Sequence, residues 1–235
     1  MHGNPHGAII ISVSIHSLAM PVVDLTFGLN GHTIPADHGY SLFSAICRLV
    51  PSVHSDETIG IHPISGRPVG CREICLTPNS SLSFRIPSEN IRMFLPLSGK
   101  ILDLDGHKIQ IGVPKTHALR PSPVLGSRLV VIKGFTSPDG FMEAAKRQLA
   151  KLRISGEPSL VPRSLSRSVE GMKGAALGSP YIRRTLQVQG YTIVGFAVRI
   201  ERINPADSIR LQEIGIGGRR RFGCGILIPQ RGLTS

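Results

Sequence analysis

The residues Leu211-Gln-Glu-Ile-Gly-Ile-Gly-Gly-Arg-Arg-Arg-Phe-Gly-Cys-Gly225 carry the strongest structural signal in this chain. The last eleven of them, the Gly–Arg loop (residues 215–225), hold five glycines and three adjacent arginines between a predicted helix and a predicted final strand. Glycine permits close approach of a ligand, exposed amides can form an anion nest, and arginine binds phosphate bidentately. The spacing fits neither a dinucleotide fingerprint nor a Walker loop. We expect an anion-binding loop; the alternative is a flexible turn with solvated arginines.

The segments before this loop predict a regular alternation of elements. In the second half, a strand is predicted at residues 128–133 and a helix from the cap Ser137 onward. A hairpin follows at 181–189 and 191–201, then a helix at 204–215 and a strand at 226–228. Residues 155–180 are rich in Ser, Gly, Pro and Arg and are expected to be a loop. The first half gives strands at 22–29, 59–64, 74–76, 82–86, 101–104 and 108–113, with helices after Asp37 and Pro87.

Both halves therefore run strand, helix, strand, strand, helix, strand. That order is the split βαβ of the ferredoxin-like fold. We predict an α+β protein of two tandem ferredoxin-like (βαββαβ, RRM-like) domains, at residues 20–114 and 115–235. Residues 1–19 are predicted to be an N-terminal extension, for which disorder is one interpretation. They resemble a short secretory leader in their apolar run, but no Lys or Arg precedes that run.

Charge is distributed very unevenly along the 235 residues. Residues 1–114 carry a net charge of −1 and residues 115–235 a net charge of +13, which favours a nucleic acid partner over a merely solubilising surface. The hydrophobic content of 41% excludes general disorder, and the absence of Trp argues against an aromatic stacking platform. No apolar run is long enough to cross a bilayer. Four cysteines make no disulfide framework in a chain of this length, so a cytoplasmic location is expected.

Three further segments share one resemblance with the Gly–Arg loop: Pro35-Ala-Asp-His-Gly-Tyr-Ser-Leu42, Gly60-Ile-His-Pro-Ile64 and Ile132-Lys-Gly-Phe135. Together with the tandem fold, they resemble the RAMP superfamily, and within it the MYXAN subtype of the CRISPR-associated endoribonucleases that cut the repeats of crRNA precursors. The similarity covers about residues 20–230. Residues 1–19 and 155–180 have no counterpart in it.

The resemblance implies metal-independent RNA cleavage with no cofactor. In this family the 2′-hydroxyl upstream of the scissile phosphate attacks in line, which leaves a 2′,3′-cyclic phosphate and a 5′-hydroxyl. Members hold a hairpin formed by the repeat and cut at its 3′ base. Many stay bound to the mature crRNA as a subunit of the interference complex, so the implied partners are repeat RNA and other complex subunits, and no membrane.

Such a reaction needs a base for the 2′-hydroxyl, and histidine, with a pKa near 6.5, is the obvious candidate. We favour His38 among the nine histidines, because it follows the predicted cap Asp37 in the first turn of a helix, whose positive end favours a neutral imidazole. His62, at the end of a predicted strand, is the second candidate. His54, in the loop after the first helix, is the third.

Other side chains complete the expected site. Tyr40 is predicted either to donate a proton or simply to pack, and Lys133 either to stabilise the phosphorane or to bind a phosphate. The residues expected to contact RNA are Gly217, Gly218, Arg219, Arg220, Arg221, Arg183, Arg184, Arg163, Arg167 and Lys173.

The sequence leaves two alternative functions open and offers one candidate metal site. Cys71 and Cys75 with His62 could supply three zinc ligands, but no second cysteine pair completes the set, so no metal is predicted. A non-catalytic RAMP-type crRNA-binding subunit of the interference complex is the main alternative function. A general basic nucleic-acid-binding module is the other, because phosphate contacts alone do not specify sequence.

Overall fold

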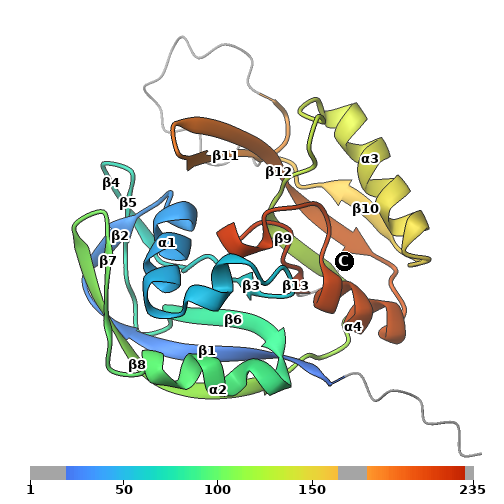
Figure 1. The fold of residues 1–235 in the computed structure, drawn as a ribbon. Helices are drawn as coiled ribbons and strands as arrows, with labels where there is room; N and C mark the ends of the chain where they lie inside the picture. Colours follow the sequence, from blue (N-terminus) through green and yellow to red (C-terminus); the bar gives the residue numbers. More distant parts are fainter. Residues whose placement is uncertain (1–19, 164–178, 231–235) are drawn as a thin grey trace, which may run out of the picture.

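The computed structural model describes residues 20–163 and 179–230. Figure 1 shows two halves, each built on a curled sheet. The first half contains a five-stranded antiparallel sheet in the order β3-β6-β1-β8-β7. Its elements are β1 (Val22–Asn30), α1 (Gly39–Leu49), β3 (Gly60–Ile61), β6 (Ser81–Pro87), α2 (Ile91–Phe94), β7 (Ile101–Leu104) and β8 (His107–Ala118). Without β7, this is the strand order of a ferredoxin-like unit.

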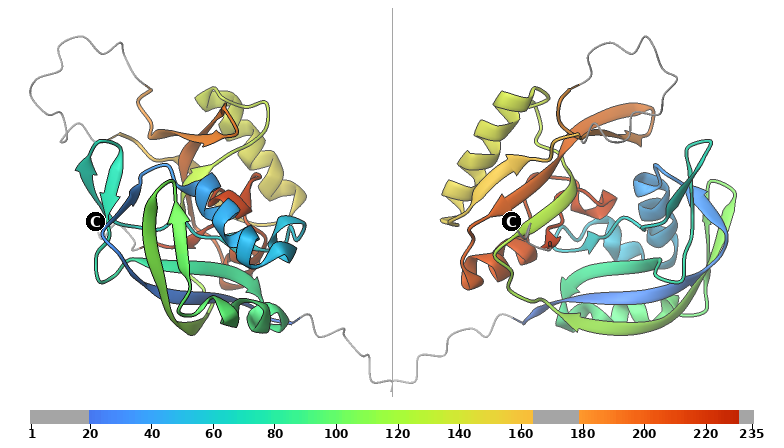
Figure 2. Two further views of the ribbon diagram at one scale, coloured as in Figure 1. Left: turned by 60° about the vertical axis from the view of Figure 1, so that its left-hand side comes forward. Right: turned by 180° about the vertical axis from the view of Figure 1, so that it is seen from behind.

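The second half repeats the plan with the sheet order β10-β12-β9-β13. Its elements are β9 (Leu125–Val130), α3 (Pro138–Lys151), β10 (Glu157–Leu160), β11 (Arg183–Val188), β12 (Tyr191–Glu201), α4 (Pro205–Ile214) and β13 (Ile228–Pro229). β11 pairs with β12 through the expected hairpin, which turns at Gln189–Gly190. In both views of Figure 2, α3 lies on the side of the second sheet that faces away from the first half.

Three hydrophobic clusters hold these elements. One belongs to the first half and includes Leu25, Phe84 and Ile46, and a second belongs to the second half around Phe141 and Phe196. A third, small cluster contains Leu129, Val131, Leu186, Val188 and Cys224, and it packs against Tyr40 and Phe222. This third cluster joins the halves, because Tyr40 also packs on the core of the first half.

Side chains alternate along the strands of the first sheet, so that one side of the sheet is apolar and the other is polar. Phe84 and Ile86 on β6 are buried in the first core, as are Val23 and Leu25 on β1. The residues between them point to the opposite side, since side chains alternate along a strand. The register pairs Asp24 with Arg85 and Thr26 with Ser83, so this side of the sheet is polar.

The structure differs from the predicted elements in several places. β8 runs to Ala118, because these residues still pair with β1, whereas the predicted strand ended at residue 113. β10 lies inside the region predicted as a loop, where Pro158 and Ser159 pair with β12. The last strand is shorter and later than predicted, and the strand expected at 128–133 lies at 125–130.

A smaller sheet extends the first half. It has the order β2-β5-β4, formed by β2 (Thr33–Pro35), β4 (Arg67–Gly70) and β5 (Glu73–Cys75). β2 leads directly into α1, which begins one residue later than expected: His38, not Asp37, is at the cap position. The Asp37 carboxylate instead accepts a hydrogen bond of 2.9 Å from the backbone N–H of Gln187 on β11. The start of α1 is thereby tied to the second half.

Candidate nucleic-acid interface

The Gly–Arg loop has a shape that its glycines impose. Four of its residues have positive φ and are glycine: Gly215, Gly217, Gly223 and Gly225. A Cβ on Gly217 would collide with the carbonyl oxygen of Val131, and one on Gly225 would collide with that of Ile216. The amide of Gly217 donates to Oε1 of Gln148 (2.8 Å), and that of Gly218 donates to the Val131 carbonyl (2.9 Å). These two amides are therefore used inside the protein, which corrects the expectation that they form an anion nest.

The three adjacent arginines point in different directions. Nη1 of Arg221 donates to the backbone carbonyls of Val53 (3.3 Å) and His54, and its Cζ lies 5.6 Å from the centre of the Phe43 ring. Arg221 therefore fastens the loop to η1 (Pro51–His54) of the first half. Arg219 is exposed at the start of the loop's 3-10 turn η5 (Arg220–Phe222). Of these two, Arg219 is the one that faces solvent.

Arg220 turns inward, toward a buried ionic cluster. Its Nε and Nη2 atoms are buried and have no hydrogen-bond partner among the described residues. Burial, with a smaller contribution from the nearby charge of Arg85, lowers the pKa of Arg220 to about 10. The Arg220 guanidinium points toward the ionic cluster and away from solvent. This orientation does not favour the expected RNA contact.

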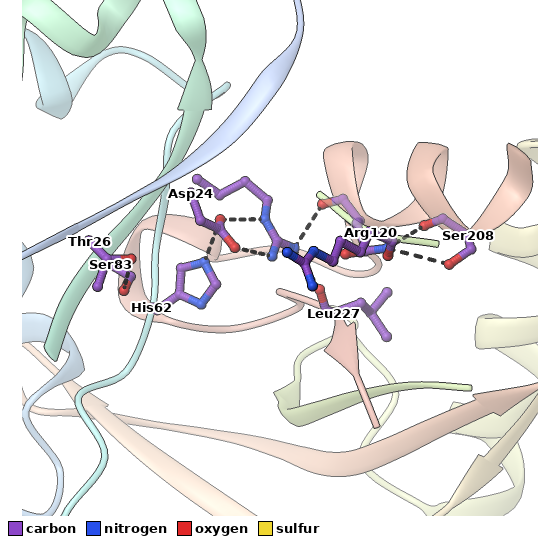
Figure 3. Close-up of polar contacts among 9 residues, drawn as sticks. Asp24, Thr26, His62, Ser83, Arg120, Ser208 and Leu227 are labelled. Carbon is purple, nitrogen blue, oxygen red and sulfur yellow. Dashed lines mark hydrogen bonds and ion pairs between the residues drawn. The ribbon is translucent and has the colours of Figure 1, made fainter. Parts of the chain in front are cut away.

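The ionic cluster itself links the two halves (Figure 3). The Arg85 side chain is 1% exposed; its Nε and Nη2 atoms donate to Oδ1 and Oδ2 of Asp24, both at 2.8 Å. Its Nη1 donates across to the carbonyls of Gln212 in α4 (3.1 Å) and Leu227 (2.5 Å). Sequence reasoning did not single out Asp24 or Arg85. The available signal was their charge at the polar positions of two paired strands.

His62, the second candidate base, belongs to this cluster. Its Nε2 lies 3.1 Å from Oδ1 of Asp24. Burial lowers the pKa of His62, although the carboxylate of Asp24 acts in the opposite direction. Burial alone would raise the pKa of Asp24, but the hydrogen bonds from His62 and Arg85 outweigh it and hold that pKa well below its usual range. His62 is thus engaged with the interface between the halves.

His38, the first candidate base, is also buried, at 1% exposure. Its Nδ1 lies 2.8 Å from the carbonyl of Pro35 and is the donor, because Nε2 accepts the backbone N–H of Ile64 at 2.9 Å. An Nε2 that accepts a hydrogen bond belongs to the neutral imidazole, and burial lowers the pKa of His38. Both ring nitrogens are occupied by backbone groups. The geometry favours a role in positioning residues 62–64 against α1.

His54 lies at the surface beside the Gly–Arg loop. It is exposed at the end of η1, its ring centre lies 6.1 Å from that of Phe43, and its carbonyl accepts from Arg221. Of the three candidate histidines, His54 alone presents an accessible imidazole next to the loop. Tyr40 is half-buried, and its ring meets the Phe222 ring edge-on at 5.8 Å, which favours packing over proton transfer.

A basic cavity of about 350 Å³ lies between the start of α1, β11 and the Gly–Arg loop. Four arginines line it, Arg72, Arg128, Arg183 and Arg184, with Asp37 as the one acidic residue of its lining. Burial lowers the pKa of Arg128 and of Arg184, and in Arg128 the neighbouring charge of Arg184 adds to the effect. Guanidinium groups that are partly desolvated and repel one another favour an anionic ligand, because its negative charge offsets both effects.

The remaining predicted residues are more scattered. Lys133 is exposed and lines a separate cavity with Arg219. Arg163 is exposed, while Arg167 and Lys173 lie outside the described residues. Within the described ranges, no three His, Cys, Asp or Glu side chains gather as a metal site. No helix there is long and apolar enough to span a membrane.

The chain resembles known proteins both in sequence and in fold. A family model described as Cas6 Crispr matches residues 23–232. The chain is 32% identical over 210 residues to a CRISPR-associated endonuclease Cas6 of Myxococcus xanthus, a match that spans 89% of this chain and 82% of that protein.

Two solved structures resemble the fold at low sequence identity. One is described as a RAMP protein binding different RNA substrates (TM-score 0.61, 13% identity, 89% of this chain and 100% of that one). The other is a Cas6-related protein from Pyrococcus furiosus (TM-score 0.59, 11% identity, 90% of this chain and 100% of that one). These likenesses confirm the predicted fold class of tandem ferredoxin-like units.

Proposed function

Because the chain belongs to the Cas6 family, we propose that it is an endoribonuclease that binds and cleaves the repeat hairpin of CRISPR precursor RNA. The observation that carries the proposal is the convergence of two basic features at Phe222. This residue lines both the four-arginine cavity and a second cavity of about 320 Å³ formed by Glu57 and residues 217–222. An RNA strand that crosses Phe222 would meet the four arginines on one side and Arg219 on the other.

The reaction that this site supports is attack by a ribose 2′-hydroxyl on the adjacent phosphorus. The O2′–P bond forms as the P–O5′ bond breaks, and the departing 5′-oxygen takes a proton from solvent water. The products are a 2′,3′-cyclic phosphate and a 5′-hydroxyl. We assign the base to His54, which takes the 2′-hydroxyl proton on its accessible imidazole. Arg219 and Lys133, which are both exposed, supply positive charge to the phosphorane. None of these roles requires a metal ion.

His38, His62 and Tyr40 take supporting roles in this proposal. His38 holds residues 62–64 to α1, and Tyr40 packs against Phe222. The RNA stem is held by Arg183 and Arg184 of β11, as phosphate contacts to an A-form duplex. The product stays bound as part of an interference complex, because the same basic contacts persist after the cut.

Cleavage of a repeat RNA in EDTA tests the proposal. The expected products carry a 2′,3′-cyclic phosphate and a 5′-hydroxyl, and His54→Ala is expected to slow cleavage by about 10²–10⁴-fold while repeat binding stays within a few fold. His32→Ala is the matched control, because His32 is also exposed but lies in the turn after β1. Cleavage that stops only in the presence of EDTA would refute metal independence.

The alternative is a non-catalytic crRNA-binding subunit with the same fold. It is favoured by the engagement of both His38 nitrogens and of His62 with protein groups. Intact RNA bound tightly and specifically by the wild-type chain would support it. Unchanged cleavage by His54→Ala together with loss in a stable His38→Ala variant would return the role of base to His38.

A further inference from the structure

A cavity of about 470 Å³ lies beside the Gly–Arg loop, and the proposed function uses only two of its lining residues, Lys133 and Arg219. We call it the Lys133 pocket. It is bounded by the segment between β9 and α3, by Gln148 near the end of α3, by the first part of β12 and by the loop. Its lining residues are Val131, Ile132, Lys133, Gly134, Thr136, Gln148, Ile193, Val194, Gly217, Gly218 and Arg219. Its volume is within the range of about 300–1,000 Å³ typical of small-ligand pockets.

The lining of the Lys133 pocket combines apolar walls with positive charge. Ile193 and Val194 are half-buried and supply aliphatic surface from β12, while Lys133 and Arg219 are exposed. No acidic residue is among its lining residues. This combination suits a ligand with a flat, weakly polar body and an attached negative charge. A nucleotide has that chemistry, and extruded bases are held by apolar side chains in other nucleic-acid enzymes.

Gly218 gives an independent indication that a ligand approaches here. The loop's other glycines are required by the fold, since each has positive φ. Gly218 has neither positive φ nor any atom within 4 Å of the place where its Cβ would be. The only other described glycine with both properties is Gly28, in β1 next to a register shift. The fold therefore leaves Gly218 free to be any residue, and its bare backbone forms part of the pocket wall.

We propose that the Lys133 pocket binds one unpaired nucleotide of the RNA, next to the hairpin. The base packs against Ile193 and Val194, and Gly218 allows it to approach the loop backbone. The phosphate next to that base is the scissile one, which Lys133 and Arg219 contact in the proposed cleavage step. This inference rests on the proposed function, because it concerns the same RNA. It adds a site for single-stranded RNA. Through this site the protein would recognise the nucleotide that flanks the hairpin.

The experiment measures binding of a repeat RNA that carries single-stranded flanks, with abasic sites introduced one at a time. For the wild-type chain, one flanking position is expected to be sensitive, with an affinity loss of about five- to tenfold, at the lower end of what base stacking contributes. Gly218→Val is expected to weaken binding of the intact RNA by a similar factor, because the added side chain fills the pocket. In that variant, the abasic site at the sensitive position should cost nothing further.

Gly28→Ala is the matched control, because a Cβ at Gly28 likewise meets no neighbour within 4 Å. It should bind intact and abasic RNA as the wild-type chain does. Equal binding by Gly218→Val and wild type, or equal abasic losses in both, would overturn the pocket assignment while leaving hairpin cleavage intact. A wild-type chain that neither binds nor cuts the repeat would instead overturn the proposed function, and the pocket assignment with it.

Discussion

Replacing Asp24 by Asn tests whether the ionic cluster holds the two halves together. The substitution keeps the shape of the side chain but removes the negative charge of the carboxylate, which accepts two 2.8 Å hydrogen bonds from Arg85. The guanidinium is 1% exposed and would remain buried without its counter-charge. Breaking a buried pair in this way costs about 3–5 kcal/mol, because the surviving charge loses its partner and gains no water.

Urea denaturation followed by circular dichroism measures this change. With a slope of about 1–3 kcal/mol per molar urea, Asp24→Asn should lower the unfolding midpoint by about 1 M or more. Glu157→Gln is the control: its partner Arg202 also lies at 2.8 Å, but both side chains are more than half exposed, so a change below about 1 kcal/mol is expected. An Asp24→Asn midpoint shifted no further than that of the control would refute the reasoning.

Three other outcomes follow from the same contacts. The pKa values of His38 and His62 are lowered by burial, so the unfolded state binds more protons below pH ~6.5. The free energy of unfolding should therefore fall with decreasing pH, by up to about 1.4 kcal/mol per pH unit for each histidine. A series of urea titrations at different pH values measures this change. Gly225→Ala should lower the melting temperature strongly, because left-handed backbone alone costs a non-glycine residue about 1–3 kcal/mol; an unchanged value would contradict the loop geometry. Arg219→Ala should reduce the slope of log K against log salt for RNA binding by about 1, whereas Arg221→Ala should instead reduce stability, as denaturation would show.

The sequence was sufficient for elements whose pattern is local. The alternation of residues 82–86 predicted β6, Asp105-Gly106 predicted the β7–β8 turn, and Asn204 predicted the start of α4, where its side chain accepts from the Asp207 amide at 2.8 Å. β10 was missed because its four residues include Pro158 and show no apolar alternation; its pairing with β12 forms it.

The candidate site was less predictable, because its geometry depends on distant residues. Nothing in three consecutive arginines indicates that Arg220 turns inward while Arg221 reaches the carbonyl of Val53. The left-handed conformation of Arg219 and the short turn after it set those directions. Likewise, His38 has a favourable position in the sequence, but the N–H of Ile64, 26 residues away, occupies its second nitrogen.

The anchoring of Arg221 on η1 has a consequence for the evolution and engineering of this protein. The carbonyl group of Val53, which accepts from Arg221, is 168 residues away from it in the sequence, so distant residues determine the conformation of the Gly–Arg loop. If residues 215–225 were transplanted into an isolated domain of the same architecture, they would not keep this loop conformation. The smallest unit that can be transferred intact is therefore the pair of domains. A recombinant of two homologues should fold correctly only if the Gly–Arg loop and η1 come from the same parent.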